Sequence, residues 1–334
     1  MKDDQTRALA DPLAAVAFYE ERYAHGYMEE WPRERCERIV EIVRALNLPA
    51  HGTALDFGCG SGALTGALRE ALPGWRIAGT DVSERAVANA RRRHPDCKFF
   101  VQGEVVPVPE RFDLVFSHHV LEHVADLRAT FTEIDGLMKP QAHMLHLLPC
   151  GNPGSYEHQL CLLRKNGIQP ELGNRFFFED EAHVRRLTTQ DLIEALTPFG
   201  YILRLAWYGN QRDAAIEWIT ASGPALVRLM ADPEEAVDAD SARKLREIRR
   251  ILLPLAFLRG FVQRTRALQK KSPCNWRDRL ALAWRLPIFR LIEPVDQRVR
   301  ARAMKEPYCD DEASFAFCSF ASSATAVGMW LRGV

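Results

Sequence analysis

Residues 54–62 read ALDFGCGSG, and this stretch decides the fold. A short apolar run around Asp56 breaks directly into a loop that holds Gly58, Gly60 and Gly62. The next residues, ALTGALREAL (63–72), repeat leucine every four positions, as a helix packed on a sheet does. A buried strand, a glycine loop and a helix in this order indicate a nucleotide-binding turn, because glycine lets the backbone bend sharply and lets a ligand approach closely.

Beyond this turn the sequence alternates between strand-like and helix-like patterns. Such alternation favours an α/β fold with a parallel sheet and right-handed crossovers. We expect strands near 53–57, 75–81, 97–101, 111–117, 141–148 and 201–209. We expect helices near 62–72, 83–93 and 125–138, and one that starts near Thr188 or Thr189 and stops at Gly200.

Four blocks of sequence resemble the class I S-adenosylmethionine (SAM)-dependent methyltransferases. They are DFGCGSG (56–62), GTDVSERAVAN (79–89), RFDLVFSHHVLEHVAD (111–126) and LMKPQAHMLHLLP (137–149), in the order that this family uses. The resemblance implies a Rossmann-like, doubly wound, mostly parallel seven-stranded sheet with SAM as cofactor. A relaxed dinucleotide pattern is also present in GCGSGA, but it is weak alone.

The resemblance and the chemistry of SAM together suggest the cofactor site. The glycines admit the methionyl and ribose parts, Asp56 accepts from the ammonium group, and Asp81 accepts from the ribose hydroxyls. Glu104 stands where the family places an acid beside the adenine amine. The predicted cofactor-binding residues are Asp56, Gly58, Gly60, Gly62, Asp81, Val82, Glu104, Ser117 and His118, the last two lining the floor beside the sulfonium. Ordinary loop acids and turn glycines are the alternative.

The sequence on either side of this core reads as helical. Residues 1–50 are expected to be helical, and the resemblance implies that they form an N-terminal lid over the cofactor. Tyr19, Tyr23, Tyr27 and Trp31 are candidate lid residues, although the same aromatics suit plain packing. The SAM-binding domain is expected over 51–209, completed by 309–334, where 312–322 supplies the last strand. Residues 210–308 then form a basic helical insertion before that strand. A separate C-terminal domain is the alternative.

A histidine-rich stretch follows the fourth strand. His119, Glu122 and His123 form an HxxEH sequence, which on a helix would place His119 beside the other two. HxxEH is the signature of inverzincin metalloproteases. A second interpretation is a metal-free stretch that packs the active-site loop. A third comes from a resemblance to ubiquinone-pathway O-methyltransferases and plant small-RNA 2′-O-methyltransferases, which hold a divalent ion with ExxEH and a distant histidine.

In this chain His119 replaces the first glutamate of that set, and His183 stands at the distant position. The predicted metal ligands are His119, Glu122, His123 and His183. Three histidines and one carboxylate favour Zn²⁺, Mn²⁺ or Fe²⁺ over Mg²⁺, and the replacement also allows a site that has lost its metal. A metal would lower the pKa of a bound hydroxyl. Without one, a histidine of the cluster or His158 would act as general base. The predicted catalytic residues are therefore His119, Glu122, His123, His158 and His183.

Charge is unevenly distributed in a chain of 334 residues with zero formal net charge. Residues 243–302 hold 17 Lys and Arg against 4 Asp and Glu, a net of +13. This region predicts peripheral contact with an anionic membrane, attraction of an acidic or RNA substrate, or packing against the acidic remainder, including that of a homodimer partner. Nucleic acid is the weaker expectation, since no RNA-binding motif is present.

Eight scattered cysteines without CxxC pairs suggest a reduced, cytoplasmic protein, with membrane-peripheral association left open. No apolar run reaches the roughly 20 residues that span a bilayer. We expect O-methylation of a hydroxyl on a small-molecule or lipid-linked acceptor. N-methylation, RNA methylation and a catalytically silent SAM-binding partner protein are the alternatives.

Overall fold

The structure is a computed structural model that describes residues 12–28, 31, 33–103, 111–180, 182–209, 211–271, 275–306 and 315–322. It divides into two compact units. The sheet unit comprises Met1–Cys150, Asp180–Ala206 and Ala316–Val334. The helical unit comprises Gly151–Glu179 and Trp207–Phe315. Each unit is described by itself.

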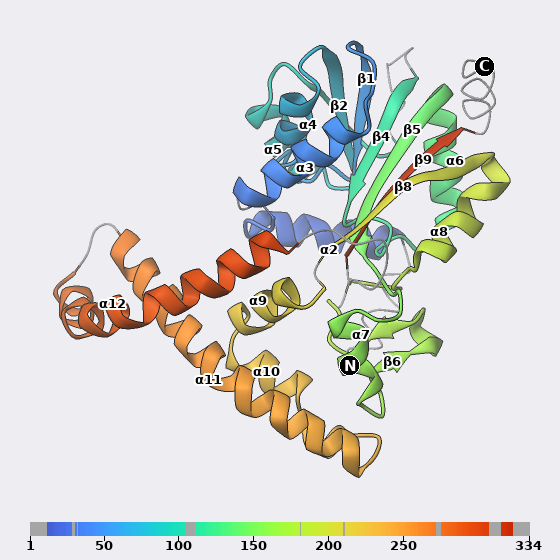
Figure 1. Cartoon of the computed structure of the whole chain (residues 1–334). Coiled ribbons are helices and arrows are strands. Elements are labelled where there is room, and N and C mark those ends of the chain that lie inside the picture. The colour runs from blue at the N-terminus through green and yellow to red at the C-terminus, as the bar shows by residue number, and fades with distance from the viewer. Residues whose placement is uncertain are drawn as a thin grey trace. The chain divides into compact units, whose positions relative to one another are not determined.

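The sheet unit is built on a seven-stranded, mostly parallel sheet in the order β3-β2-β1-β4-β5-β9-β8 (Figure 1). Its strands are β1 (Gly52–Phe57), β2 (Trp75–Asp81), β3 (Lys98–Val101), β4 (Phe112–His118), β5 (Met138–Pro149), β8 (Tyr201–Gly209) and β9 (Phe315–Ser322). The inner strands are nearly continuous apolar runs because helices cover both faces of the sheet. The expected α/β, Rossmann-like fold is confirmed.

The strand order places a crevice at the carboxyl ends of β1 and β4. The chain runs outward from β1 to β3 and then returns to pair β4 with the other side of β1, all in parallel. The pairs Phe57↔Thr80 and Phe57↔Ser117 show that β1, β2 and β4 end at the same level. In such sheets ligands bind where the winding reverses, so the glycine loop and residues 118–123 lie at the expected binding edge.

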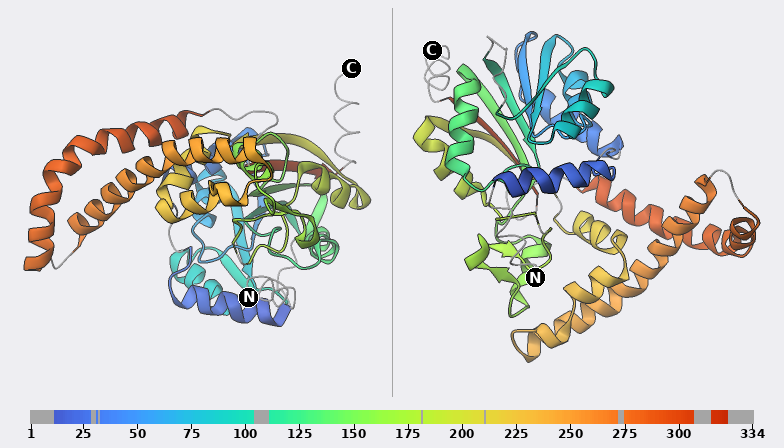
Figure 2. Two further views of the ribbon diagram at one scale, coloured as in Figure 1. Left: turned by 90° about the horizontal axis from the view of Figure 1, so that it is seen from below. Right: turned by 180° about the vertical axis from the view of Figure 1, so that it is seen from behind.

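Helices lie on the two sides of the sheet, with α3, α4 and α5 on one side and α6 and α8 on the other (Figures 1 and 2). The helix bounds in this unit are α2 (Pro12–Ala24), α3 (Arg33–Ala45), α4 (Thr65–Ala71), α5 (Glu84–Arg93), α6 (Leu127–Leu137) and α8 (Thr189–Leu196), followed by the 3-10 turn Thr197–Phe199. Thr188 caps α8 in a reciprocal capping box with Asp191, which agrees with the predicted helix start.

The last strand lies where the sequence suggested. β9, which falls within the predicted 312–322, pairs into the sheet between β5 and β8. The segment that separates β8 from β9 in sequence is mainly helical. A long helical segment therefore interrupts the sheet between its last two strands.

The helical unit has its own core. Leu160, Ile219, Val227 and Leu245, from four different helices, are buried in one apolar cluster. Its elements are α7 (Tyr156–Leu162), β6 (Ile168–Gln169), β7 (Arg175–Phe176), α9 (Asp213–Ala221), α10 (Pro224–Met230), α11 (Ala239–Lys270) and α12 (Trp276–Lys305), with 3-10 turns at Pro170–Leu172 and Pro233–Glu235. Among the described helices, none is long and apolar enough to cross a bilayer.

The division into units differs from the expected boundaries, most of all after β5. Residues 151–179, which we assigned to the SAM-binding domain, group with α9–α12 instead. Glu157 of α7 accepts a hydrogen bond from Trp218 Nε1 of α9 at 2.6 Å, and Arg164 donates to the carbonyl of Leu229 at 2.8 Å. These contacts tie the segment after β5 to the helical unit.

Candidate functional site

A cavity of about 580 Å³ opens at the carboxyl edge of the sheet. Its walls come from the glycine loop, the ends of β2, β3 and β4, the start of α6, and the N-terminal residues 15–31. The volume lies within the roughly 300–1,000 Å³ of small-molecule sites. The predicted cofactor residues in its lining are Asp56, Gly58, Gly60, Asp81, Val82 and His118.

The glycine loop and Asp81 are joined directly. Asp81 Oδ2 accepts from the Gly60 amide at 2.9 Å, and Oδ1 accepts from the Ser83 amide at 3.0 Å. Gly60 has a φ of +52°, and a Cβ there would meet the Tyr23 hydroxyl at 2.8 Å. At Gly58, φ is +74° and a Cβ would meet Val120 at 2.3 Å. Both positions therefore require glycine.

Two buried carboxylates give the cavity a negative character. Burial raises the pKa of Asp81 to about 6, although the hydrogen bonds from the Ser83 and Gly60 amides act in the opposite direction and lower it. Burial also raises the pKa of Asp56 to about 7, although Thr65 donates to it at 2.6 Å. Asp126 and Glu133 add acids, while the described lining residues include no Lys or Arg. Such a cavity favours a ligand with a cationic centre, such as the ammonium and sulfonium of SAM.

The lid candidates Tyr19, Tyr23, Tyr27 and Trp31 all line this cavity. Arg22 of α2, the helix that carries Tyr19 and Tyr23, donates from one nitrogen to both carboxylate oxygens of Asp180 at 3.1 Å. The Tyr19 hydroxyl is buried and has no hydrogen-bond partner among the described residues. An aromatic wall with a buried polar group facing a cavity suits a ligand with both apolar and polar parts.

The HxxEH sequence is not helical, so the helical spacing considered for it does not apply. His119 has a φ of +55°, and its amide donates to the carbonyl of Leu147 on β5 at 2.9 Å. Residues 121–123 form a turn, closed by a bond from the His123 amide to the Val120 carbonyl at 2.9 Å. The side chains nevertheless meet, because the turn folds Glu122 back onto His119.

Glu122 is the centre of a buried cluster. Its Oε1 accepts from His119 Nδ1 at 2.7 Å and lies 4.0 Å from the Nε2 atoms of both His123 and His183. Its Oε2 is buried and has no hydrogen-bond partner among the described residues. Burial opposes ionisation, but the neighbouring histidines prevail and lower the pKa of Glu122 to about 2. Glu122 is therefore a carboxylate at neutral pH.

His183 reaches the cluster from a segment far away in sequence. The Val184 amide donates to the Glu122 carbonyl at 2.9 Å, and His123 Nδ1 donates to the Ala182 carbonyl at 3.0 Å. This second bond leaves the lone pair of His123 on Nε2, facing Glu122. Burial lowers the pKa of His123 to about 4, so it is neutral at physiological pH.

Ligand atoms of His119, Glu122 and His183 lie within 4.8 Å of one another, a spacing that a metal ion could bridge. His123 is not part of that three-residue group, although its ring lies 4.7 Å from that of His183. Of the four predicted metal ligands, three therefore lie close enough to share an ion, and His123 lies beside them. Two imidazoles and a carboxylate match the donors that Zn²⁺, Mn²⁺ or Fe²⁺ accept.

Other predicted residues lie elsewhere. Ser117 was expected to line the floor, but its hydroxyl bonds His146 Nδ1 at 2.8 Å in the sheet interior, so that placement is wrong. Gly62 does not line the cavity; its carbonyl accepts from His94 Nε2 at 2.8 Å. Glu104 lies outside the described residues. His158 lies in the helical unit on α7, its ring 6.1 Å from that of Phe176.

Sequence reasoning missed part of the lining. Gln102 and Gly103 follow β3, and Asp126, Thr130 and Glu133 come from α6. Gln102 Nε2 donates to Glu133 Oε2 at 2.7 Å, which joins the two walls. Asp126 caps α6 by accepting from the Ala129 amide at 3.0 Å. The available signal was the polar Gln102 directly after the carboxyl end of β3.

Known proteins share this sequence pattern. Residues 55–144 match the family described as methyltransferase domain. A trans-aconitate 2-methyltransferase of Escherichia coli O157:H7 is 32% identical over 197 residues, covering 57% of this chain and 74% of that protein. One from Acidovorax ebreus is 25% identical over 221 residues, covering 64% and 83%.

Among solved structures, magnesium protoporphyrin IX methyltransferase of Synechocystis with bound SAH aligns with a TM-score of 0.42 at 17% identity, covering 59% of this chain and 92% of that one. The family assignment rests on sequence: the Escherichia coli relative is 32% identical over 74% of its length, and the matched methyltransferase domain, residues 55–144, includes the glycine loop at the cavity. On that basis the chain belongs to the class I SAM-dependent methyltransferases.

Proposed function

We propose that the chain methylates a hydroxyl oxygen of a small-molecule or lipid-linked acceptor. The observation that carries this proposal is the His119–Glu122 hydrogen bond, 2.7 Å long, at the wall of the cavity. A hydroxyl is a weak nucleophile until a base removes its proton, and a histidine oriented by a buried carboxylate is suited to that task.

The hydrogen bond fixes the tautomer of His119. Because the Glu122 carboxylate accepts from Nδ1, the lone pair of His119 is on Nε2. Glu122 would stabilise the imidazolium that forms when Nε2 takes the acceptor's proton. Trp31 stacks near His119 with ring centroids 6.1 Å apart and planes at 18°, which restricts the imidazole further. SAM supplies the electrophilic methyl group when bound.

The cavity residues would hold the two reactants. The Asp81 carboxylate would accept from the ribose hydroxyls, and the Asp56 carboxylate would face the ammonium group. The aromatic side chains of residues 19–31 would exclude water from the reacting groups. Such positioning provides much of the acceleration in a group transfer.

The same cluster supports a second proposal, in which a divalent metal assists. His119, Glu122 and His183 would hold the ion, with His123 beside them. The observation in its favour is the buried, unpartnered Oε2 of Glu122, because burying an ionised oxygen without a partner is costly. A bound metal would lower the pKa of an acceptor hydroxyl.

We propose a methyl acceptor different from the trans-aconitate in the names of the relatives. Trans-aconitate carries three carboxylates, and the described lining of this cavity holds acids and histidines but no Lys or Arg. With no cation in the described lining to pair with them, burying the carboxylates of such an anion would be costly. A neutral alcohol or phenol avoids this cost. We therefore place the methyl group on a hydroxyl and not on a carboxylate.

The test is transfer of radiolabelled methyl from SAM to small-molecule extracts, to phenols and catechols, and to trans-aconitate. We expect a base-stable product, since ethers resist mild alkali while methyl esters release methanol. Glu122→Gln should lower kcat by about 10²–10⁴ with little change in SAM affinity, and Glu41→Gln, on the exposed face of α3, should not. Base-labile label would favour a carboxylate acceptor. SAM binding without transfer would favour a silent partner protein.

A further inference from the structure

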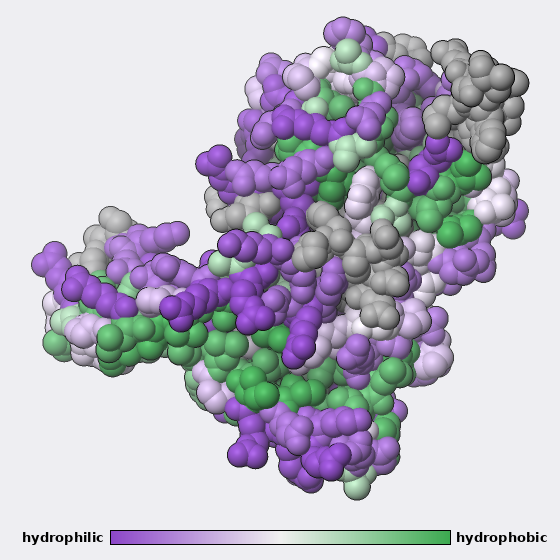
Figure 3. All heavy atoms as spheres, viewed as in Figure 1, coloured by the Kyte–Doolittle hydropathy of each residue, from purple (hydrophilic) through white to green (hydrophobic). Residues whose placement is uncertain are grey.

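One face of α12 exposes an apolar stripe. Trp276, Leu280, Trp284, Ile288, Leu291 and Val295 recur at three- and four-residue spacing and are 69%, 64%, 54%, 42%, 78% and 38% exposed. That spacing places them along a single side of the helix. Figure 3 shows hydrophobic residues gathered over the α11–α12 hairpin, bordered by hydrophilic ones. A continuous exposed apolar face on a folded domain indicates a binding surface.

Cations flank this stripe. Arg277, Arg279 and Arg290 of α12 are exposed. Arg285 packs its guanidinium over the rings of Phe261 and Trp284, 5.1 and 5.0 Å from their centroids. Tryptophan and arginine beside exposed leucine is the composition of a helix that rests at a lipid–water interface.

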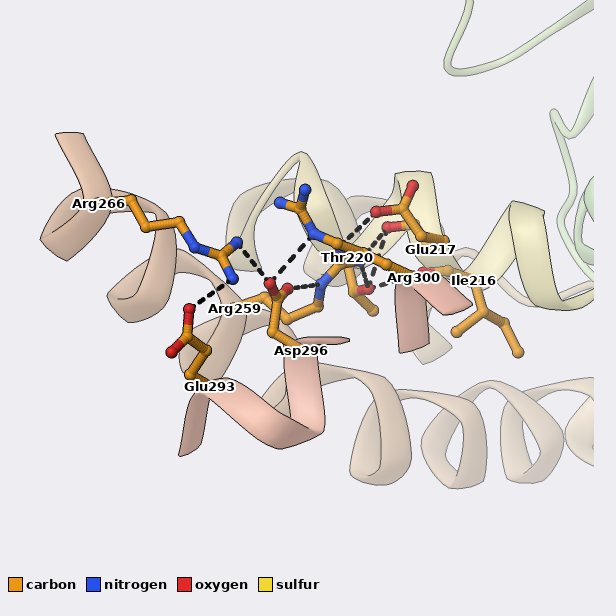
Figure 4. A network of polar contacts seen from close by, with 8 residues as sticks. All are labelled: Ile216, Glu217, Thr220, Arg259, Arg266, Glu293, Asp296 and Arg300. Atoms are coloured by element: carbon orange, nitrogen blue, oxygen red, sulfur yellow. Dashed lines mark hydrogen bonds and ion pairs between the residues drawn. The ribbon is translucent and has the colours of Figure 1, made fainter. Parts of the chain in front are cut away.

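The acids of α12 face inward instead. Asp296 is fully buried and pairs with Arg259 and Arg266 at 2.8 Å each, as Figure 4 shows. Glu293 pairs with Arg266 at 3.1 Å, and Asp278 with Lys271 at 2.8 Å. Residues 251–305 hold 13 Lys and Arg against these three acids, so the excess of positive charge is left for the outer surface.

A basic hollow lies at the end of the same hairpin. It has a volume of about 560 Å³ and is lined by Arg264, Ala267, Leu268, Lys270, Lys271 and Arg285. Nε and Nη1 of Arg285 have no hydrogen-bond partner among the described residues. Besides Lys271, which pairs with Asp278, the three cationic side chains of Arg264, Lys270 and Arg285 border this open hollow and suit a phosphate headgroup.

We propose that the α11–α12 hairpin binds the surface of a bilayer that contains anionic lipids. The stripe from Trp276 to Val295 enters the boundary between headgroups and acyl chains, and the hollow receives lipid phosphates. The charge pattern selects this occupant. A second copy of the chain would bring the same cations to the stripe, and RNA would leave its leucine, isoleucine and valine side chains in water.

The test is sedimentation of the full chain with vesicles of phosphatidylcholine alone and of phosphatidylcholine with about one third phosphatidylglycerol. We expect binding to the anionic vesicles, weakened at about 0.5 M salt. Leu280→Glu/Leu291→Glu should reduce the partition coefficient by about tenfold or more, because both leucines are among the most exposed residues of the stripe. Both sites face solvent, so the variant should fold.

The matched control is Leu162→Glu, another exposed leucine of the helical unit, on α7. It should bind vesicles as the wild type does. Failure of the wild type to bind anionic vesicles would overturn the proposal, as would equal binding by the double variant. A wild-type dimer that the double variant dissociates, without vesicle binding, would assign the stripe to a second copy. RNA binding in place of vesicle binding would also overturn it.

Discussion

Asp81 Oδ2 accepts a hydrogen bond from the Gly60 amide at 2.9 Å, so the end of β2 fixes the glycine loop that follows β1. Both residues line the cavity. Gly60 can make this approach because it has a positive φ and no side chain against Tyr23. A single carboxylate thus shapes the loop and remains available to accept from a ligand.

Affinity for SAM should depend on pH through Asp81. Burial raises the pKa of this carboxyl to about 6, and only the carboxylate accepts from the ribose hydroxyls. The association constant should therefore fall about tenfold as pH drops from about 7.5 to about 5. Calorimetric titration across this range measures it. An Asp81→Asn variant should show a flatter profile, and equal slopes in both proteins would contradict the assignment.

Metal content tests the histidine cluster. We expect untagged wild-type protein to carry about one metal ion, measured by inductively coupled plasma mass spectrometry, if Glu122 Oε2 is a ligand. His183→Ala should lose it, while His25→Ala, at an exposed histidine of the N-terminal segment, should retain it. Absence of metal from every protein, even after addition of Zn²⁺, Mn²⁺, Fe²⁺ and Mg²⁺, would leave the cluster as a general base.

Buried His146 should make the sheet unit sensitive to acid. Burial lowers its pKa to about 3, so below its unfolded pKa of about 6.5 the unfolded chain binds a proton that the folded chain does not. Stability is therefore lost as pH falls. Between pH of about 7 and 5 the wild type should lose about 2 kcal/mol more unfolding free energy than His146→Leu.

Urea denaturation at the two pH values measures that difference. The variant leaves Ser117 Oγ without its 2.8 Å partner, which costs stability at both pH values and cancels in the comparison. Parallel losses in the two proteins would show that His146 is not the source of the acid sensitivity.

The buried pair of Arg259 and Asp296 should be essential to the helical unit. Asp296 also pairs with Arg300 at 3.1 Å, so its removal leaves three arginines around two acids, Glu217 beside Arg259 and Glu293 beside Arg266 (Figure 4). Asp296→Ala should cost about 3–5 kcal/mol, seen as an early loss of helical circular dichroism in urea. Asp240→Ala, in an exposed pair with Lys244, should change little. Equal effects would contradict the buried-pair account.

Much of the fold could be read from local sequence. The apolar run before the glycine loop indicated β1, the alternation of strand and helix patterns indicated the other parallel strands, and Thr188 or Thr189 together with Gly200 marked the ends of the segment that holds α8. These signals are local, because a strand's burial and a helix's cap depend on neighbouring residues. The existence of β9 was also inferred, since one strand of the sheet was otherwise missing, but its place between β5 and β8 comes from the structure.

The errors came from contacts between distant residues. Spacing of three and four suits a turn as well as a helix, and the bond from the His119 amide to Leu147 decides for a turn. Ser117 and His118 are adjacent on β4, so they point to opposite faces and cannot both line one floor. Asp126 and Glu133 were missed because the side of α6 that faces the cavity is set by packing.

The central claim is that the cavity beside Gly60 and Asp81 binds SAM. Titration calorimetry with S-adenosylhomocysteine, the product that SAM leaves, tests it on wild type, Asp81→Asn and the control Asp96→Asn, whose side chain is 79% exposed. We expect one site in the wild type and the control. The affinity of Asp81→Asn should be about 10- to 100-fold weaker, because the variant loses hydrogen bonds to a charged acceptor. No binding by the wild type, or equal affinity in all three proteins, would contradict the account.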